Sequence, residues 1–550
     1  MPVRESSVYQ LLGQAIGPAP RRAQPTHLVS IVPSGLDYDV AYEILVLVSL
    51  GRLVIAHIST VLNAISTLTS ARACSLLRAR RLDLPYELAA KYSTVPTAPG
   101  TYHIRSVILT PGGMLVRPAE RSPGNRVLRD AFQSLTAWAV LTDPGKYLLR
   151  VTFRDSTGKL TDKGLPTARR VMEEGLTLAG HRFVFFTYTD RQLQATSAWF
   201  VSTEAPLTPA AILRELGEFN RIGSPGVYAA RVRQCFSETL PYYGEYEWRR
   251  QDDVVSESGL CFTDGAGTIS KQLLRTIASH LKLDRVPAAL QIRVGGAKGV
   301  VVEDPSLEGM VLCTRPSMHK FESTASTIEV CLGGWSTFKS GNLNRQLITL
   351  LSSRGVPDDA FWSLHACMVA LLQHLLDASK PEQPSNAKQK TLEACQWLQP
   401  TGCMLDMLRG GVDPKADRLL ADMLHQLYAS YWERIKDRGR IKIHESCLLM
   451  GVPTTAPSAL QYGEVYLWPD SPHDHSRFPS PITGDVIVAK NPAMHPGDIL
   501  VLKAVDKPEL RHLRNVLVFP VKGPRPHASE TSGSDLDGDE VCRDPLTHIP

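Results

Sequence analysis

The residues best suited to chemistry lie near the C-terminus, in the run SGSDLDGDE from Ser532 to Glu540. Three carboxylates, those of Asp535, Asp537 and Asp539, fall within five residues, and like charges this close repel one another unless a cation neutralises them. In an extended or looped backbone the alternate spacing directs all three to one side, and Gly538 gives the freedom for a tight curve. Because carboxylate oxygens are hard ligands, the run predicts a site for Mg²⁺ or Mn²⁺.

Two other interpretations of this acidic run need to be weighed. A calcium EF-hand loop starting at Asp535 would need glycine at its sixth position and glutamate at its twelfth, but these positions hold Glu540 and Leu546. The EF-hand is therefore excluded. A solvated acidic turn is the usual fate of an isolated pair of aspartates, and the run by itself leaves this interpretation open.

The elements that must position these carboxylates are mostly strands. Glycine and proline, 39 of each, interrupt the chain at short intervals, and the runs between them are β-branched or aromatic, as in HRFVFF, GVVV and NVLVFPV. Outside one segment we therefore expect a β-rich chain. That segment, Leu343 to about Arg438, has apolar residues at helical spacing, and the polar connector SKPEQPSNAKQK divides it into two runs. The first run contains Phe361, Leu364, Met368, Leu371, Leu372, Leu375 and Leu376.

Composition indicates a folded chain outside the membrane. The 550 residues include 60 Lys or Arg and 55 Asp or Glu, a net charge of +5, and 43% are hydrophobic, which excludes disordered, collagen-like and coiled-coil chains. The most apolar stretch, Ile44 to Ile58, is shorter than the about 20 residues that span a bilayer, so we expect it to be buried core. The N-terminus lacks a secretory signal and the 10 cysteines form no C-x-x-C pair, which predicts the cytoplasm or nucleus.

Several segments in one order resemble a known family. The segment KNPAMHPGD (490–498) followed by the acidic run resembles the catalytic segment of the eukaryotic RNA-dependent RNA polymerases of RNA silencing. Upstream, CFTDGAGTIS (261–270), QIRVGGAKGV (291–300) and RPSMHKF (315–321) look like family motifs in the family's order. The resemblance covers the chain from about residue 105 to its end, which falls shortly after the acidic run. Family members continue further, so we expect a C-terminally truncated member.

The resemblance implies an α+β fold in which two double-psi β-barrels are bridged by helices and preceded by a mixed N-terminal region. The implied domains are a poorly assigned region 1–104, a mixed α/β region 105–244, the first barrel 245–340, a helical connector 341–441 and the second barrel 442–550.

The implied chemistry is nucleotidyl transfer, in which two divalent ions activate the attacking hydroxyl and stabilise the leaving pyrophosphate. The three aspartates would bind the metal, and Lys298 and Lys490 would act as catalytic, nucleotide-binding cations already in position for the triphosphate. An ordinary solvated lysine is the alternative for each. The glycines expected to shape the loops around these residues are Gly538, Gly295, Gly296 and Gly299.

Other residues of these motifs have two interpretations. Arg315 and Lys320 could contact RNA phosphate, and a structural ion pair is an equal alternative. Asp264 precedes a glycine, so we expect a turn there. We expect His495 to orient its loop, because metal-assisted transfer needs no imidazole.

The predicted function is therefore an RNA-directed RNA polymerase that copies single-stranded RNA into double-stranded RNA for siRNA production. Its partners would be the RNA template, ribonucleoside triphosphates, the double-stranded product and proteins of the silencing pathway. The alternative is a catalytically impaired fragment or paralogue that binds RNA or silencing partners. An unrelated metal hydrolase fits less well, since the chain has no G-x-S-x-G, H-E-x-x-H or G-x-x-x-x-G-K-[ST] motif.

Overall fold

The computed structural model describes residues 2–18, 33, 35–85, 102–122, 124–131, 144–155, 159–188, 196–204, 208–378, 380, 387–398, 403–471, 478–538 and 540–545. The chain divides into two compact units. The first contains Met1–Leu240 and Phe321–Ser326, and the second contains Pro241–Lys320 and Thr327–Pro550. Each unit has hydrophobic clusters of its own.

The first unit begins with helices: α1 (Pro2–Ala15), α2 (Tyr38–Ser49), η1 (Ile55–His57), α3 (Ile58–Ile65) and α4 (Ser70–Arg81). The expectation of β-rich structure is wrong here. Helix α2 contains several β-branched residues, which favour strands. Their strand propensity is outweighed because nearly every side of the helix is buried and because the Asp37 carboxylate caps its N-terminus. The predicted buried stretch is also only partly buried, since Val54 and Ile55 are 61% and 50% exposed.

A six-stranded sheet follows in the order β2-β1-β3-β6-β5-β4. Its strands are β1 (Tyr102–Thr110), β2 (Gly113–Ser122), β3 (Leu148–Phe153), β4 (Leu176–Leu178), β5 (His181–Thr187) and β6 (Ser197–Ser202). The other elements of the unit are η2 (Val127–Ala131), η4 (Pro144–Tyr147), α6 (Leu165–Glu174), α8 (Pro209–Leu216), α9 (Pro225–Arg233) and η5 (Gln234–Phe236).

The second unit contains two seven-stranded sheets. The first has the order β7-β13-β10-β11-β9-β12-β8. Its elements are β7 (Thr239–Tyr242), β8 (Glu247–Arg250), β9 (Ala266–Ile269), α10 (Lys271–His280), β10 (Ala289–Val294), β11 (Ala297–Glu303), β12 (Val311–Thr314), η6 (Pro316–Met318) and β13 (Ile328–Trp335). Parallel pairs such as β9 with β11 alternate with antiparallel pairs such as β10 with β11, so the sheet is mixed.

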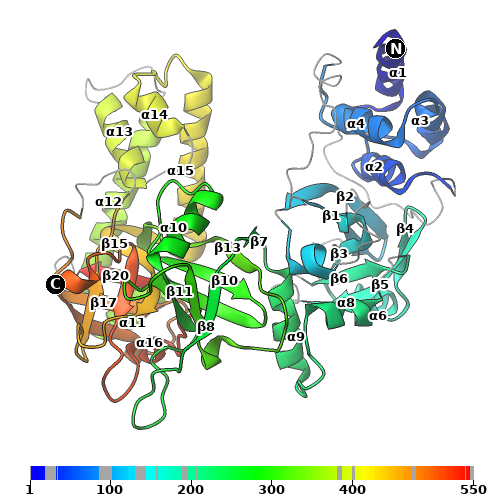
Figure 1. Cartoon of the computed structure of the whole chain (residues 1–550). Helices are drawn as coiled ribbons and strands as arrows, with labels where there is room; N and C mark the ends of the chain where they lie inside the picture. Colours follow the sequence, from blue (N-terminus) through cyan, green and yellow to red (C-terminus); the bar gives the residue numbers. More distant parts are fainter. Residues whose placement is uncertain are drawn as a thin grey trace. The chain divides into compact units, whose positions relative to one another are not determined.

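Helices interrupt the strands after this sheet. They are α11 (Arg345–Ser353), α12 (Asp358–Asp377), α13 (Ala387–Leu398), α14 (Met404–Arg409) and α15 (Arg418–Arg438), drawn in yellow-green and yellow in Figure 1. Leu372, Leu375 and Leu424 are completely buried between them, as the helical spacing predicted. The polar connector is shorter than predicted because α13 begins at Ala387, inside it.

The other sheet of the second unit has the order β14-β15-β19-β16-β18-β17-β20. Its elements are β14 (Lys339–Leu343), β15 (Ile441–Pro453), β16 (Glu464–Leu467), β17 (Gly484–Lys490), η7 (Pro496–Asp498), β18 (Ile499–Ala504), η8 (Pro508–Leu510), β19 (Val516–Phe519), α16 (His527–Glu530) and β20 (Glu540–Pro545). β20 pairs with both β15 and β17, so the strand that leaves the acidic run is held on two sides.

Within the described ranges, every helix is too short or too polar to cross a lipid bilayer.

Candidate active site

The acidic run forms a loop between α16 and β20, and Leu536 anchors it. This leucine is only 3% exposed and packs in the same cluster as Phe519 and Ala528. Its two aspartate neighbours differ, because Asp537 is 9% exposed whereas Asp535 is half-buried. The third predicted ligand, Asp539, lies outside the described residues.

The backbone of the loop bends through left-handed conformations. The φ angles of Ser532, Gly533 and Gly538 are +55°, +63° and +126°, and Ser534 is not among the residues with positive φ. The φ angle of Gly538 lies in the region that favours glycine, and its predicted role in the loop stays a prediction.

Lys298 of β11 brings the other sheet of the second unit to this loop. Its ammonium group forms an ion pair and hydrogen bond with the carboxylate of Asp537, although 239 residues separate them in sequence. Both side chains are largely shielded from solvent, with 25% and 13% of their surface exposed. The predicted cation and one of the predicted ligands are thus in direct contact.

Two further contacts from the same sheet hold the backbone of the loop. The amide nitrogen of Leu536 donates to the carbonyl oxygen of Asp264 at 2.8 Å. The side-chain nitrogen of Gln291 donates to the carbonyl oxygen of Asp537 at 2.6 Å. Asp264 lies in a turn, as its sequence predicted, and the next residue, Gly265, packs directly against Asp537.

The electrostatic surroundings keep Asp537 ionised. Burial raises the pKa of its carboxyl group, but the charge and hydrogen bond of Lys298 and the charges of Arg293 and Lys320 lower it more. The net pKa is below its ordinary value. At neutral pH the site therefore holds a carboxylate surrounded by cations from the other sheet.

A hydrogen-bonded cluster supports the turn beneath Asp537. The amide nitrogen of Gly265 donates to the hydroxyl oxygen of Ser317 at 3.1 Å, and that hydroxyl donates to the carboxylate of Asp253 at 2.7 Å. The hydroxyl of Thr263 donates to the same carboxylate oxygen at 2.9 Å. The turn cannot move without breaking these bonds.

Arg315 and Lys320 also contact this cluster. The guanidinium of Arg315 donates to the carbonyl oxygen of Asp252, and the ammonium of Lys320 donates to the carbonyl oxygen of Ser317 at 2.6 Å. Both side chains therefore bind backbone, and Lys320 is also one of the charges that lower the pKa of Asp537. Their predicted contact with RNA phosphate stays a prediction.

Lys490 lies at the end of β17, where it is in register with Val541 of β20. The segment after it is a loop in which the Asp498 carboxylate accepts hydrogen bonds from the amides of Met494 and His495 at 2.8 and 2.9 Å. The ring of His495 accepts a hydrogen bond from the amide of Gly497 at 3.0 Å, so its visible role is in loop geometry.

Two of the three other predicted glycines lie where a side chain would be strained or would not fit, namely Gly295 and Gly299. Gly295 has a φ of +55° in the turn between β10 and β11, and the carbonyl of Gly296 accepts a hydrogen bond from the amide of Lys320. A Cβ atom on Gly299 would lie 2.1 Å from the carbonyl oxygen of Gly265. The backbone at Gly265, just before β9, and the backbone at Gly299 in β11 therefore lie too close together for a side chain at Gly299.

Sequence reasoning missed three residues of the site: Gln291, Arg293 and Asp253. The first two have a signal in the sequence, because they alternate with buried apolar residues on β10 and so share one face of the strand. Asp253 gives no such signal, since its partners Thr263 and Ser317 lie 10 and 64 residues away at no regular spacing.

Among the side chains that the structure describes, no group of three or more His, Cys, Asp or Glu residues is placed to hold a metal ion. Asp535 and Asp537 of the aspartate loop are among these side chains, and Asp539 lies outside the described residues. The donor chemistry still suits a hard cation, since both are carboxylates and Asp537 is ionised.

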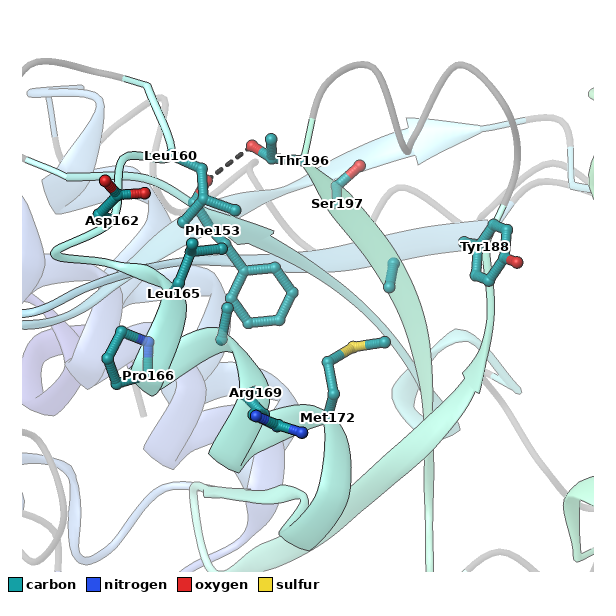
Figure 2. A pocket seen from close by; sticks show the side chains of 12 residues that line it. Phe153, Leu160, Asp162, Leu165, Pro166, Arg169, Met172, Tyr188, Thr196 and Ser197 are labelled. Carbon is teal, nitrogen blue, oxygen red and sulfur yellow. Dashed lines mark hydrogen bonds between the residues drawn. The ribbon is translucent and has the colours of Figure 1, made fainter.

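A cavity of ≈ 690 Å³ lies in the first unit, next to α6. Its lining is mainly apolar, and Figure 2 shows Phe153, Leu165 and Met172 around it, with Asp162 and Arg169 as charged members. The predicted site residues all belong to the second unit, so none of them lines this cavity.

Comparison with known proteins gives consistent matches. A family model described as RNA dependent RNA polymerase matches residues 109–548. The probable RNA-dependent RNA polymerase SHL2 of Oryza sativa subsp. japonica is 34% identical over 471 residues, which cover 79% of this chain and 37% of that protein. RNA-dependent RNA polymerase 6 of Arabidopsis thaliana is 32% identical over 468 residues, which cover 79% of this chain and 38% of that protein. The chain therefore spans less than half the length of these two relatives.

A solved structure is also similar. RNA dependent RNA polymerase QDE-1 from Thielavia terrestris matches with a TM-score of 0.67 and 22% identity, over 96% of this chain and 64% of that chain. The likeness confirms the predicted fold class, an α+β chain with two double-psi β-barrels.

Proposed function

The chain belongs to the RNA-dependent RNA polymerase family, as the resemblance of its motifs predicted, and from this we propose that it copies single-stranded RNA into double-stranded RNA. The substrates would be ribonucleoside triphosphates, and the product would serve RNA silencing. The observation that carries the proposal is the contact of Lys298 with Asp537, because it joins the basic motif of one sheet to the acidic motif of the other.

The chain's own residues support two of the requirements of nucleotidyl transfer. The first is an ionised carboxylate, and the lowered pKa of Asp537 provides it. The second is a cluster of cations for the triphosphate, and Lys298, Arg293 and Lys320 lie near enough to Asp537 to lower its pKa. Lys490, on the strand paired with β20, is the further cation that we propose for the substrate.

The family generally uses divalent metal ions. We propose that Asp535, Asp537 and Asp539 hold Mg²⁺ or Mn²⁺, which would stabilise the negative charge that develops on the reacting phosphate and the leaving pyrophosphate. Asp537 would keep its carboxylate in place through its hydrogen-bonded peptide group. In this structure Lys298 neutralises the charge of that carboxylate. Once a divalent cation neutralises it instead, the ammonium group of Lys298 would be available to bind a triphosphate.

The test is incorporation of labelled ribonucleotides on a single-stranded RNA template with Mg²⁺ or Mn²⁺. We expect product from the unaltered chain, and only background from Asp537→Asn and Lys298→Met. Asp506→Asn is the matched control, because that carboxylate pairs with Arg511 at the exposed surface. Its activity should equal that of the unaltered chain.

Two results would contradict the proposal. Incorporation that survives Asp537→Asn would show that the reaction occurs elsewhere or in a contaminant. RNA binding without incorporation, unchanged by Asp537→Asn, would instead support an RNA-binding chain that does not polymerise.

A further inference from the structure

Gln291 connects the two sheets of the second unit at the aspartate loop. It lies on β10, where its neighbours Leu290 and Ile292 are buried in the core. Its side chain leaves that strand and donates to the carbonyl oxygen of Asp537 at 2.6 Å, a separation of 246 residues in sequence. The hydrogen bond therefore fixes the peptide group that joins Asp537 to Gly538.

Two glycines leave the space that Gln291 occupies. A Cβ atom on Gly538 would lie 2.0 Å from the side-chain nitrogen of Gln291, so the amide rests directly on the backbone of the loop. A Cβ atom on Gly334 of β13 would lie 3.0 Å from the Cβ of Gln291. The close approach of the two glycines therefore leaves the side chain of Gln291 little room for other conformations.

The strand pairing around Gln291 is irregular in a way that makes this space. Leu290 pairs with Trp335 and Ile292 pairs with Val330, so β13 bulges away between these two pairs. The bulge lies opposite Gln291, and bulges often redirect a side chain next to a functional site. The local geometry thus directs a polar side chain from an otherwise apolar strand toward the aspartate loop.

We propose that Gln291 is a positioning residue: it holds the Asp537–Gly538 peptide so that the carboxylates of the loop keep the spacing that a divalent cation needs. The inference rests on the proposed metal-dependent function, and it concerns a residue that the motif comparison did not assign. Gln291 would not touch the metal or the substrate. It would act through the backbone of Asp537.

The test is Mn²⁺ binding to the full chain, measured without RNA or nucleotide by the paramagnetic resonance signal of free Mn²⁺. Gln291→Met keeps the length of the side chain and removes the donor. We expect Mn²⁺ affinity to fall about fivefold, which corresponds to about 1 kcal/mol, the contribution of one hydrogen bond. Gln272→Met, at an exposed position of α10, is the control and should bind Mn²⁺ like the unaltered chain.

A purely structural role would give a different pattern. It predicts a lower unfolding midpoint for Gln291→Met with unchanged Mn²⁺ affinity of the folded protein, and that result would overturn the proposal. Absence of Mn²⁺ binding to the unaltered chain would overturn it too, because there would be no cation site to position. If Gln291→Met does not fold, Gln291→Asn provides the same comparison, since its amide is one methylene too short to reach Asp537.

The Mn²⁺-binding test and the test of RNA synthesis can fail independently of each other. Weakened Mn²⁺ binding by Gln291→Met, in a chain that makes no RNA, would support the positioning role and reject polymerisation. In an active chain, we expect the same variant to raise the Mn²⁺ concentration needed for half-maximal rate, with much of the rate recovered at saturating Mn²⁺.

Discussion

Replacing Gly265 by alanine should disturb the site through a single contact with Asp537. The same replacement at Gly259, which has a similar backbone angle, separates the effect of this contact from that of backbone strain. Gly265 and Gly259 have nearly equal φ angles, +77° and +80°. An alanine at either position should therefore cost a similar amount of backbone strain, about 1–2 kcal/mol of the free energy of unfolding. The two positions differ in their surroundings. Nothing lies within 4 Å of a Cβ atom on Gly259, whereas a Cβ atom on Gly265 would lie 2.8 Å from the Cβ of Asp537.

The extra overlap should add about 1–3 kcal/mol to the destabilisation by Gly265→Ala, the usual range for a group forced into a packed region. The turn cannot easily relieve it. The amide of Gly265 is bonded to Ser317, and the neighbouring Asp264 carbonyl is bonded to Leu536. Because each of these bonds is worth about 1 kcal/mol, we expect Asp537 to shift instead.

The assay compares the urea midpoints of the two variants and their rates of ribonucleotide incorporation per folded molecule. Gly259→Ala should lose stability by the strain alone and keep its rate. Gly265→Ala should lose more stability and at least tenfold in rate, which corresponds to about 1.4 kcal/mol in the activation barrier. Equal midpoints and equal rates for the two variants would refute the reasoning that Gly265 packs on the carboxylate-bearing side chain of Asp537.

Three further predictions concern an ion pair, a loop and the helices. Lys298→Met should cost about 1–3 kcal/mol of stability at pH 7, since it leaves the carboxylate of Asp537 without the hydrogen bond of its nearest cation. Folding lowers the pKa of the Asp537 carboxyl group, so its ionised form stabilises the protein at any pH above the pKa in the unfolded chain. The difference in urea midpoint between Lys298→Met and the unaltered chain should therefore persist down to about pH 4 and become smaller only below that pH. Asp498→Ala should speed amide hydrogen exchange at residues 494 and 495, measured by mass spectrometry, because it removes the acceptor of both amides; unchanged exchange would contradict the assigned hydrogen bonds. Leu372→Ala in α12 should cost about 2–5 kcal/mol, whereas Leu419→Ala, 64% exposed, should change stability by less than about 0.5 kcal/mol, and thermal unfolding of the two variants tests this contrast.

Much of the strand structure could be predicted from local sequence. The run Val300 to Val302 is β-branched and follows Gly299, and it forms the buried centre of β11. The helical spacing after Leu343 predicted the buried face of α12 equally well. In both cases one local pattern decides the structure, because the residues that must be buried are neighbours on one face.

The N-terminal helices and the contacts of the site could not be predicted in this way. In α2, burial on nearly every side outweighs strand propensity, and burial depends on partners elsewhere in the chain. The resemblance implied that Lys298 and Asp537 serve one reaction, but it did not predict their direct contact, because spacing within either motif says nothing of the other. Gln291 was missed because its partner is the backbone carbonyl of Asp537, and the sequence does not mark which carbonyl a side chain will bind.

The pairing of β14 with β15 has a consequence for the helices between them. Leu343 and Ile441 are directly opposite each other in this antiparallel pair, so the chain leaves and returns to the sheet at neighbouring positions. Topologically, residues 344–440 are therefore the loop of a β-hairpin, however many helices they contain. Insertions of this kind can be shortened, lengthened or exchanged without changing any strand order, because the sheet requires only that the two ends remain a strand spacing apart. A short turn in place of the helical segment would therefore keep the strand order, but it would uncover Ile441 and Ile443 of β15, which pack with Phe361 and Met368 of that segment.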